Sequence, residues 1–156
     1  MLSGVSLHRY IMLVYASLSV VGCSSSVGPS GQRQLAQAES RWKSRNIQNY
    51  TFEMRTSCFC PQEVNEWAVA EVRNGEIVSA QSLTGTPLTG FALSSRKTVE
   101  QLFDAARPPY QDWVADVDFD FDAALGYPLR VNLISKPNIA DAGAVYEARN
   151  LKPITP

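Results

Sequence analysis

The sequence predicts an α+β fold in a single compact domain, with helices and antiparallel strands in the order α-β-β-β-α-β-β-β. Three observations lead to this prediction. Apolar residues recur at helical spacing after Gln32, residues 50–55 alternate between apolar and polar, and Asn74-Gly75 separates two apolar segments. The chain has 156 residues, of which 45% are hydrophobic and 19% charged, as in an ordinary globular domain.

The first helix is expected from Gln32 to about Asn46. Leu35, Ala38 and Trp42 share one face of that helix, and most of its other positions are polar. Residues 50–55, Tyr-Thr-Phe-Glu-Met-Arg, alternate cleanly between apolar and polar side chains. This alternation predicts a strand that is buried on one face only.

A β-hairpin is expected around Asn74-Gly75, because a type I′ turn needs positive φ at both of its central residues. Its strands are residues 67–73 and 76–82, in a register that places Arg73 opposite Glu76 and Val72 opposite Ile77. An ion pair between Arg73 and Glu76 would add only about a few tenths of a kcal/mol. Residues 83–97 show no periodicity and are expected to form a long surface loop, a kind of segment that is often functional.

The second helix is expected to begin at Thr98, because residues 98–101, Thr-Val-Glu-Gln, form a capping-box sequence. Pro108-Pro109 ends that helix. Three further strands are expected at residues 113–122, 129–134 and 145–151. One hydrophobic core is expected, and it should include Trp42, Phe52, Met54, Leu102, Phe103, Val131 and Leu133.

Residues 1–22 are expected to be a lipoprotein signal peptide. His8 and Arg9 form a short basic region, and the apolar run from Ile11 to Val21 has the length of a signal-peptide core. That run is shorter than the roughly 20 residues of a transmembrane helix. The next residues, ending in Gly22-Cys23, resemble a bacterial lipobox, in which the cysteine is acylated and becomes the N-terminus. An ordinary signal peptide with a chance cysteine is the alternative.

Residues 23–31 are then expected to be lipidated Cys23 and a flexible tether, since residues 24–31 are mostly small and polar. Such a segment spans on the order of 15 Å, and two or more acyl chains, such as palmitate, anchor a protein stably. The single domain would occupy residues 32–156. The expected location is the cell envelope, and Ser24 favours the periplasmic face of the outer membrane if the cell is Gram-negative.

Composition limits the chemistry that this chain can perform. A net charge of −1 predicts no basic surface, so nucleic acid is not an expected partner. His8 is the only histidine and lies in the signal segment, so the mature chain would lack imidazole for nucleophilic triads and for zinc or copper sites. Phosphate-loop, G-x-S-x-G and H-E-x-x-H motifs are absent from the sequence. We therefore expect no cofactor and no enzymatic activity, although carboxylate or Ser-Lys chemistry stays open.

Cys58 and Cys60 are the two thiols that remain if Cys23 is acylated. Residues i and i+2 of a strand lie about 6.6–6.8 Å apart, at the outer limit of disulfide geometry. A bend before Pro61 would bring them closer. A local structural disulfide is the favoured interpretation in an oxidising compartment. A redox centre, a metal-thiolate site, intermolecular pairing and free thiols are the alternatives.

Aspartates alternate with apolar residues between positions 116 and 122. The pattern predicts a strand with an acidic face, opposite a face that carries Val117, Phe119 and Phe121. A calcium loop starting at Asp118 would need Gly at its sixth position and Glu at its twelfth, where the chain has Ala123 and Leu129. A solvated face near Arg130 that discourages edge pairing is the favoured interpretation. A hydrolase that uses Asp120 and Asp122 has no further support.

Trp67, Phe91 and Tyr127 are the candidate residues for a binding surface. They fall in expected strands or loops, where aromatic side chains can line a groove. A place in the core is the alternative for each of them, as it is for Tyr110, Trp113 and Tyr146.

Several short motifs occur in one order over residues 40–151, and Cys58-Phe59-Cys60-Pro61 and Gly126-Tyr127-Pro128 are the most recognisable. The others are Trp42, Tyr50-Thr51-Phe52, Asn74-Gly75, Thr98-Val99-Glu100-Gln101-Leu102-Phe103, Phe121-Asp122 and Asp141. Together they resemble a family of small secreted bacterial proteins and lipoproteins known only as a domain of unknown function. The resemblance implies an envelope location and this fold class, and it carries over no catalytic residues.

The expected function is therefore that of a bacterial envelope lipoprotein, anchored in the membrane through Cys23. It would act as a non-enzymatic binding or structural module toward an envelope protein or a cell-wall partner. The alternative is an envelope protein for thiol redox chemistry or metal binding that acts through Cys58 and Cys60.

Overall fold

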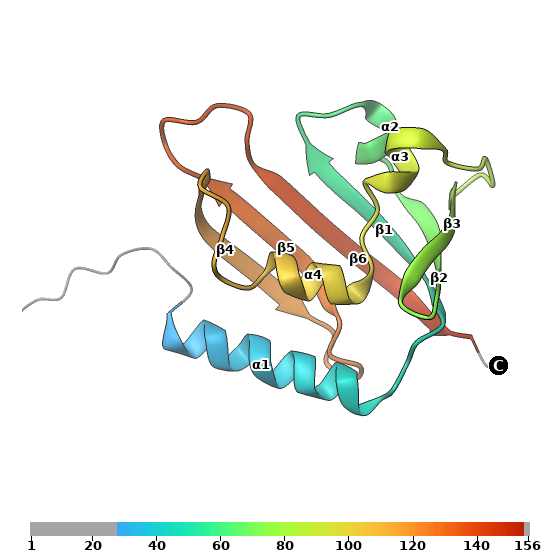
Figure 1. Ribbon diagram of the computed structural model, residues 1–156, viewed down its shortest axis with the longest axis horizontal. Helices are drawn as coiled ribbons and strands as arrows, with labels where there is room; N and C mark the ends of the chain where they lie inside the picture. Colours follow the sequence, from blue (N-terminus) through green and yellow to red (C-terminus); the bar gives the residue numbers. More distant parts are fainter. Residues whose placement is uncertain (1–27, 155–156) are drawn as a thin grey trace, which may run out of the picture.

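The computed structural model describes residues 28–154 and contains a six-stranded antiparallel sheet with helices packed on one face (Figure 1). The expected α+β class and single domain are confirmed. The elements are α1 (Pro29–Ser44), β1 (Tyr50–Cys58), α2 (Gln62–Asn65), β2 (Ala68–Arg73), β3 (Glu76–Ser82), α3 (Gly90–Ser94), α4 (Val99–Ala105), β4 (Val114–Phe121), β5 (Pro128–Ser135) and β6 (Ala144–Pro153).

The strand order is β3-β2-β1-β6-β5-β4, so two three-stranded meanders meet where the first strand pairs with the last. In that central pair Thr56 lies opposite Tyr146 and Met54 opposite Ala148. The two expected helices, α1 and α4, and the six expected strands occur in the predicted order. The short helices α2 and α3 were not expected. Because α3 falls within residues 83–97, part of the segment expected to be a loop is helical.

The first helix begins earlier than expected, at Pro29. Residues 29–31, expected to belong to the tether, are therefore helical. Proline favours the first helical position, because its fixed φ suits a helix and its missing N–H needs no partner there. The amide of Gln32 donates to the carbonyl of Gly28 at 3.1 Å and closes the first turn. Cys23, the rest of the tether up to residue 27 and the expected signal peptide lie outside the described residues.

The hairpin between β2 and β3 has the predicted register, with Val72 opposite Ile77 and Arg73 opposite Glu76. Asn74 and Gly75 have φ values of 50° and 79°, as a type I′ turn requires. The facing pair does not become an ion pair, because Arg73 Nε instead contacts Glu71 Oε1 at 2.7 Å. These two residues lie two apart on β2, next to a shift in the strand register, and so project to the same side of the sheet.

All seven expected core residues are buried, between the sheet and the helices α1 and α4. The capping box of α4 is present: Thr98 Oγ1 accepts from the amide of Gln101, and Gln101 Oε1 accepts from the amide of Thr98. The hydroxyl of Tyr50 accepts from the amide of Val99 at 2.9 Å, which fixes the start of α4 over β1.

The other face of the sheet carries charged side chains. The register aligns Arg55, Glu147, Arg130 and Asp120 in one row across β1, β6, β5 and β4. At the β4 edge Asp118 and Asp120 are exposed, whereas Val117 is buried and Phe119 and Phe121 pack against the core. The alternation expected for this strand is thus confirmed.

Candidate functional site

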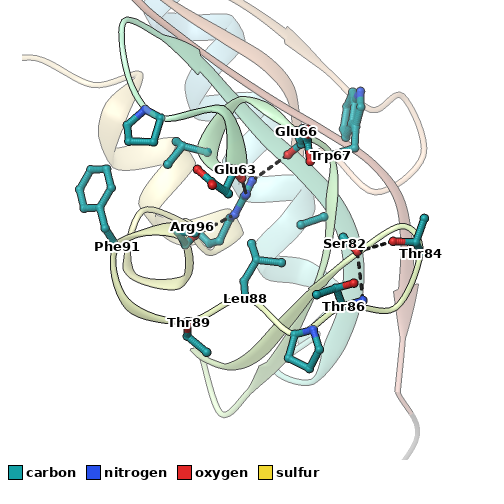
Figure 2. Close-up of a pocket in the computed structure, with 15 residues that line it drawn as sticks. Glu63, Glu66, Trp67, Ser82, Thr84, Thr86, Leu88, Thr89, Phe91 and Arg96 are labelled. Atoms are coloured by element: carbon teal, nitrogen blue, oxygen red, sulfur yellow. Dashed lines mark hydrogen bonds between the residues drawn. The ribbon is translucent and has the colours of Figure 1, made fainter.

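A cavity of about 620 Å³ lies where α2, α3, the start of β2 and the segment after β3 meet (Figure 2). Figure 1 shows this corner on the side of the molecule away from β4 and the first turn of α1. The lining residues are Pro61, Glu63, Val64, Glu66, Trp67, Ala68, Ser82, Thr84, Thr86, Pro87, Leu88, Thr89, Phe91, Ala92 and Arg96.

The segment after β3 folds back along that strand and forms one wall of the cavity. The amide of Leu88 donates to the carbonyl of Ala80 at 2.8 Å, and the amide of Ser82 donates to the carbonyl of Thr86 at 2.8 Å. The hydroxyl of Ser82 lies 2.8 Å from the hydroxyl of Thr84 and also accepts from the amide of Thr86. This wall therefore offers the side chain of Leu88 together with several hydroxyl groups.

Arg96 lies at the inner end of the cavity and is only 4% exposed. Its guanidinium donates to the carbonyls of Ala92, Met54, Glu66 and Glu63 at 2.5–3.2 Å. It forms no ion pair within the part of the chain that the structure describes, and burial lowers the pKa of its guanidinium. Arg96 thus ties β1, α2 and α3 together through backbone oxygens.

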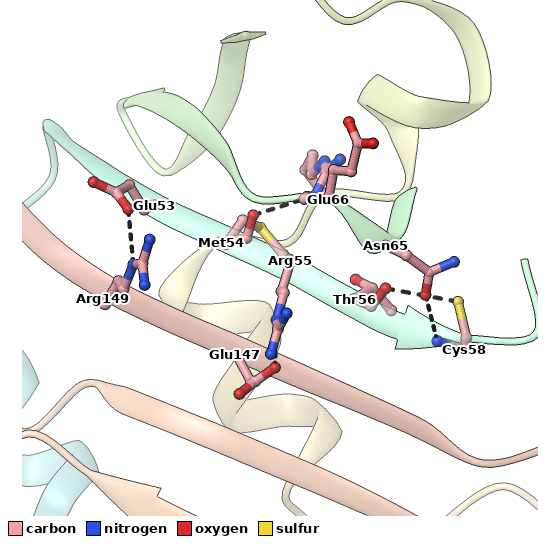
Figure 3. A network of polar contacts seen from close by, with 10 residues as sticks. Glu53, Met54, Arg55, Thr56, Cys58, Asn65, Glu66, Glu147 and Arg149 are labelled. Carbon is pink, nitrogen blue, oxygen red and sulfur yellow. Dashed lines mark hydrogen bonds and ion pairs between the residues drawn. The ribbon is translucent and has the colours of Figure 1, made fainter. Parts of the chain in front are cut away.

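Cys58 and Cys60 form a disulfide at the end of β1, with their Cα atoms 5.3 Å apart. Strand β1 ends at Cys58, so the chain bends there and the two residues come closer than in a regular strand. Asn65 holds the bend: its Oδ1 accepts from the amide of Cys58 at 2.9 Å (Figure 3), and its Nδ2 donates to the carbonyl of Cys60. Phe59, between the two cysteines, is 84% exposed.

Of the three aromatic candidates, Trp67 and Phe91 belong to this site. Both line the cavity, and Phe91 is 64% exposed. The ring of Trp67 points away from Arg96 and Leu88 (Figure 2) and lies under the guanidinium of Arg149, at 3.9 Å from its centroid. Trp67 therefore connects the cavity to the charged face of the sheet.

Tyr127, the third candidate for a binding surface, is only 4% exposed, so the alternative of a place in the core holds for it. Its ring packs edge-on against Trp42, with centroids 6.4 Å apart, and burial raises the pKa of its hydroxyl. The Gly126-Tyr127-Pro128 motif inserts this ring under α1, so its role is in packing.

The charged face of the sheet is organised into ion pairs. Arg55 contacts Glu147 at 2.6 Å, and Arg149 contacts Glu53 at 2.8 Å (Figure 3). Hydrogen bonds from Asn150 and Arg149 hold the pKa of Glu53 below its ordinary value. These charges neutralise one another in pairs, so the face has no excess of one sign at these positions.

Sequence reasoning missed Glu63, Asn65, Glu66, Leu88 and Arg96, which come together only in the folded chain. The length and aperiodicity of residues 83–97 were a signal for Leu88 and Arg96, and no pattern pointed toward Glu63, Asn65 and Glu66. Between residues 28 and 154 no group of three or more His, Cys, Asp or Glu residues is arranged to hold a metal ion. Over the same range no helix is both long and apolar enough to cross a membrane.

Comparison with known proteins identifies a family for this chain. The model of a family of unknown function, DUF6174, matches residues 34–153. No curated protein and no solved structure matches the chain. The family match covers every strand of the sheet and all but the first residues of α1.

Proposed function

The chain belongs to the DUF6174 family of unknown function, and on that premise we propose that it is a bacterial envelope lipoprotein that acts by binding rather than by catalysis. The lipobox-like residues ending at Cys23 support the anchor, and Ser24 favours the outer membrane in a Gram-negative cell. The lack of any histidine after His8 argues against most hydrolytic chemistry. The partner would be an envelope protein or a cell-wall component.

The observation that carries the binding role is the cavity beside Phe91. Its volume of about 620 Å³ falls within the range of roughly 300–1,000 Å³ that is typical of ligand sites. Phe91 stays 64% exposed at its rim although it is a large aromatic residue. Large aromatic side chains are enriched where proteins bind partners, because they bury much apolar area at low entropic cost.

The position of the cavity also suits an anchored protein. α1 begins on the β4 side of the sheet, and α2 and α3, which contribute residues to the cavity, lie away from that side (Figure 1). A lipid attached upstream of α1 would therefore join the domain at the end away from the cavity, which leaves the cavity open to a partner.

The first experiment is an intact-mass measurement on the chain purified from bacterial membranes, with a Cys23→Ser variant as the control. We expect a chain that begins at Cys23 and carries acyl groups, and a variant that loses both the acyl mass and the membrane association. An unlipidated wild-type chain would exclude the anchor. Chemical crosslinking in whole cells, compared between wild type and Phe91→Ser, tests the binding role. If the variant recovers the same partners at the same yield as the wild type, a binding role for the cavity is excluded.

A second candidate function is thiol redox chemistry or metal binding through Cys58 and Cys60. The favouring observation is that the disulfide lies at a strand end beside the exposed Phe59, where another protein can reach it. A partner dithiol would transfer two electrons and two protons to this bond and become a disulfide itself. Unchanged tolerance of redox and metal stress in a Cys58→Ser/Cys60→Ser strain would exclude this function.

A further inference from the structure

The charges around the cavity differ in how accessible they are. Glu63 and Glu66 are exposed lining residues, and neither forms an ion pair with another described residue. Arg96, the only basic lining residue, is 4% exposed and is hydrogen-bonded to four backbone carbonyls. An incoming molecule therefore meets two exposed carboxylates, of which Glu66 accepts a hydrogen bond from Gln62 Nε2 at 2.7 Å, and no exposed cation among the lining residues.

Exposed apolar side chains also neighbour the lining residues along the chain. Six large hydrophobic residues are exposed in the described chain, and three of them belong to this corner: Phe91 lines the cavity, Leu83 lies between the lining residues Ser82 and Thr84, and Phe59 lies two residues before Pro61. A compact small molecule would fill the cavity without covering Leu83 and Phe59. An elongated ligand that fills the cavity can continue along the chain segments that carry them.

We propose that the cavity beside Phe91 binds an extended polypeptide segment of a partner protein that carries apolar side chains flanked by lysine or arginine. The apolar side chains pack against Val64, Leu88 and Phe91. The flanking cations lie beside the carboxylates of Glu63 and Glu66. This inference rests on the binding role proposed above and assigns the chemical class of the ligand.

The test uses the purified full chain and labelled ten-residue peptides in fluorescence anisotropy titrations. One peptide carries two leucines flanked by lysines, a second has glutamate in place of each lysine, and a third has serine in place of each leucine. We expect the Lys/Leu peptide to bind most tightly. Added salt should weaken its binding, because the attraction between exposed charges is screened.

Glu63→Gln/Glu66→Gln should weaken binding of the Lys/Leu peptide by roughly 3–10-fold, the loss expected for two exposed charge pairs. Asp118→Asn/Asp120→Asn is the matched control, because it removes two exposed carboxylates from the far edge of the sheet and should leave the affinity unchanged. Phe91→Ser should weaken binding of both leucine-containing peptides, and Val78→Ser, at another exposed apolar residue, should not.

Two results separate the failure of this inference from the failure of the binding role. If the Glu/Leu or the Lys/Ser peptide binds as tightly as the Lys/Leu peptide and Phe91→Ser weakens that binding, the cavity binds ligands but the basic, apolar specificity is wrong. If no peptide binds in a way that depends on Phe91, both this inference and the binding role of the cavity are overturned.

Discussion

Gly126 lies directly against the backbone of Ala38, so close that a Cβ atom on Gly126 would stand 2.5 Å from the carbonyl oxygen of Ala38. This contact joins the turn before β5 to the middle of α1. Gly126 also has a φ of +87°, a conformation that side chains other than glycine rarely adopt. The position therefore requires glycine for two separate reasons, and it allows Tyr127 to insert beside Trp42.

The first prediction is that Gly126→Ala destabilises the domain much more than Gly75→Ala. Gly75 also has a positive φ, of +79°, but a Cβ there meets nothing within 4 Å. Gly75→Ala should cost about 1 kcal/mol from backbone strain alone, and Gly126→Ala should cost at least ~2 kcal/mol more because the backbones of α1 and the turn must separate. Urea unfolding measures the loss of stability in both variants. Equal losses for Gly126→Ala and Gly75→Ala would show that α1 can move away from the turn at no cost.

The second prediction concerns Arg96. Replacing it by methionine leaves the carbonyls of Met54, Glu63, Glu66 and Ala92 without this donor, so we expect a loss of roughly 3–5 kcal/mol in the free energy of unfolding. Arg130→Met is the matched control, since Arg130 is exposed, and it should change stability by less than about 0.5 kcal/mol. Similar unfolding curves for the two variants would mean that Arg96 is not a structural link.

The third prediction concerns pH. Hydrogen bonds from Asn150 and Arg149 lower the pKa of Glu53 below its ordinary value of 4.5. A carboxylate with a lowered folded-state pKa stabilises the protein above its unfolded-state pKa, and this contribution is lost as the pH falls through the folded-state value. Glu53→Gln should therefore flatten the fall in unfolding free energy below about pH 4.5.

NMR titration of the Glu53 carboxyl provides an independent measurement. Both Asn150→Ala and Arg149→Met should raise its pKa, because each removes one of the bonds that favour the charged form. A pKa of Glu53 that stays unchanged in both variants would contradict this account of the charged face.

The fourth prediction is that the Cys58–Cys60 disulfide adds only modest stability. It closes a loop of three residues, for which the loss of chain entropy in the unfolded state corresponds to about 1–2 kcal/mol. Cys58→Ser/Cys60→Ser should cost about that amount, since Asn65 still holds the bend. Adding Asn65→Ala to the double variant should cost clearly more in thermal unfolding, and no additional loss would show that Asn65 does not hold the segment.

Much of the fold could be predicted from local patterns. The faces of α1 and β1, the hairpin register at Asn74-Gly75 and the capping box at Thr98 each depend on residues a few positions apart. The start of α1 was misplaced because residues 28–31 are polar and small, and composition outweighed the helix-starting preference of Pro29.

The site was harder to predict because its parts are distant in the chain. The sequence by itself determined the two main helices, the six strands, the seven expected core residues and the alternating face of β4, since side-chain periodicity decides which face is buried. Only the tertiary structure decided that Tyr127 lies under α1, that Arg96 is buried among carbonyls, and that Glu63, Leu88 and Phe91 share one cavity. These features depend on where separate segments pack together, and no local spacing encodes that arrangement.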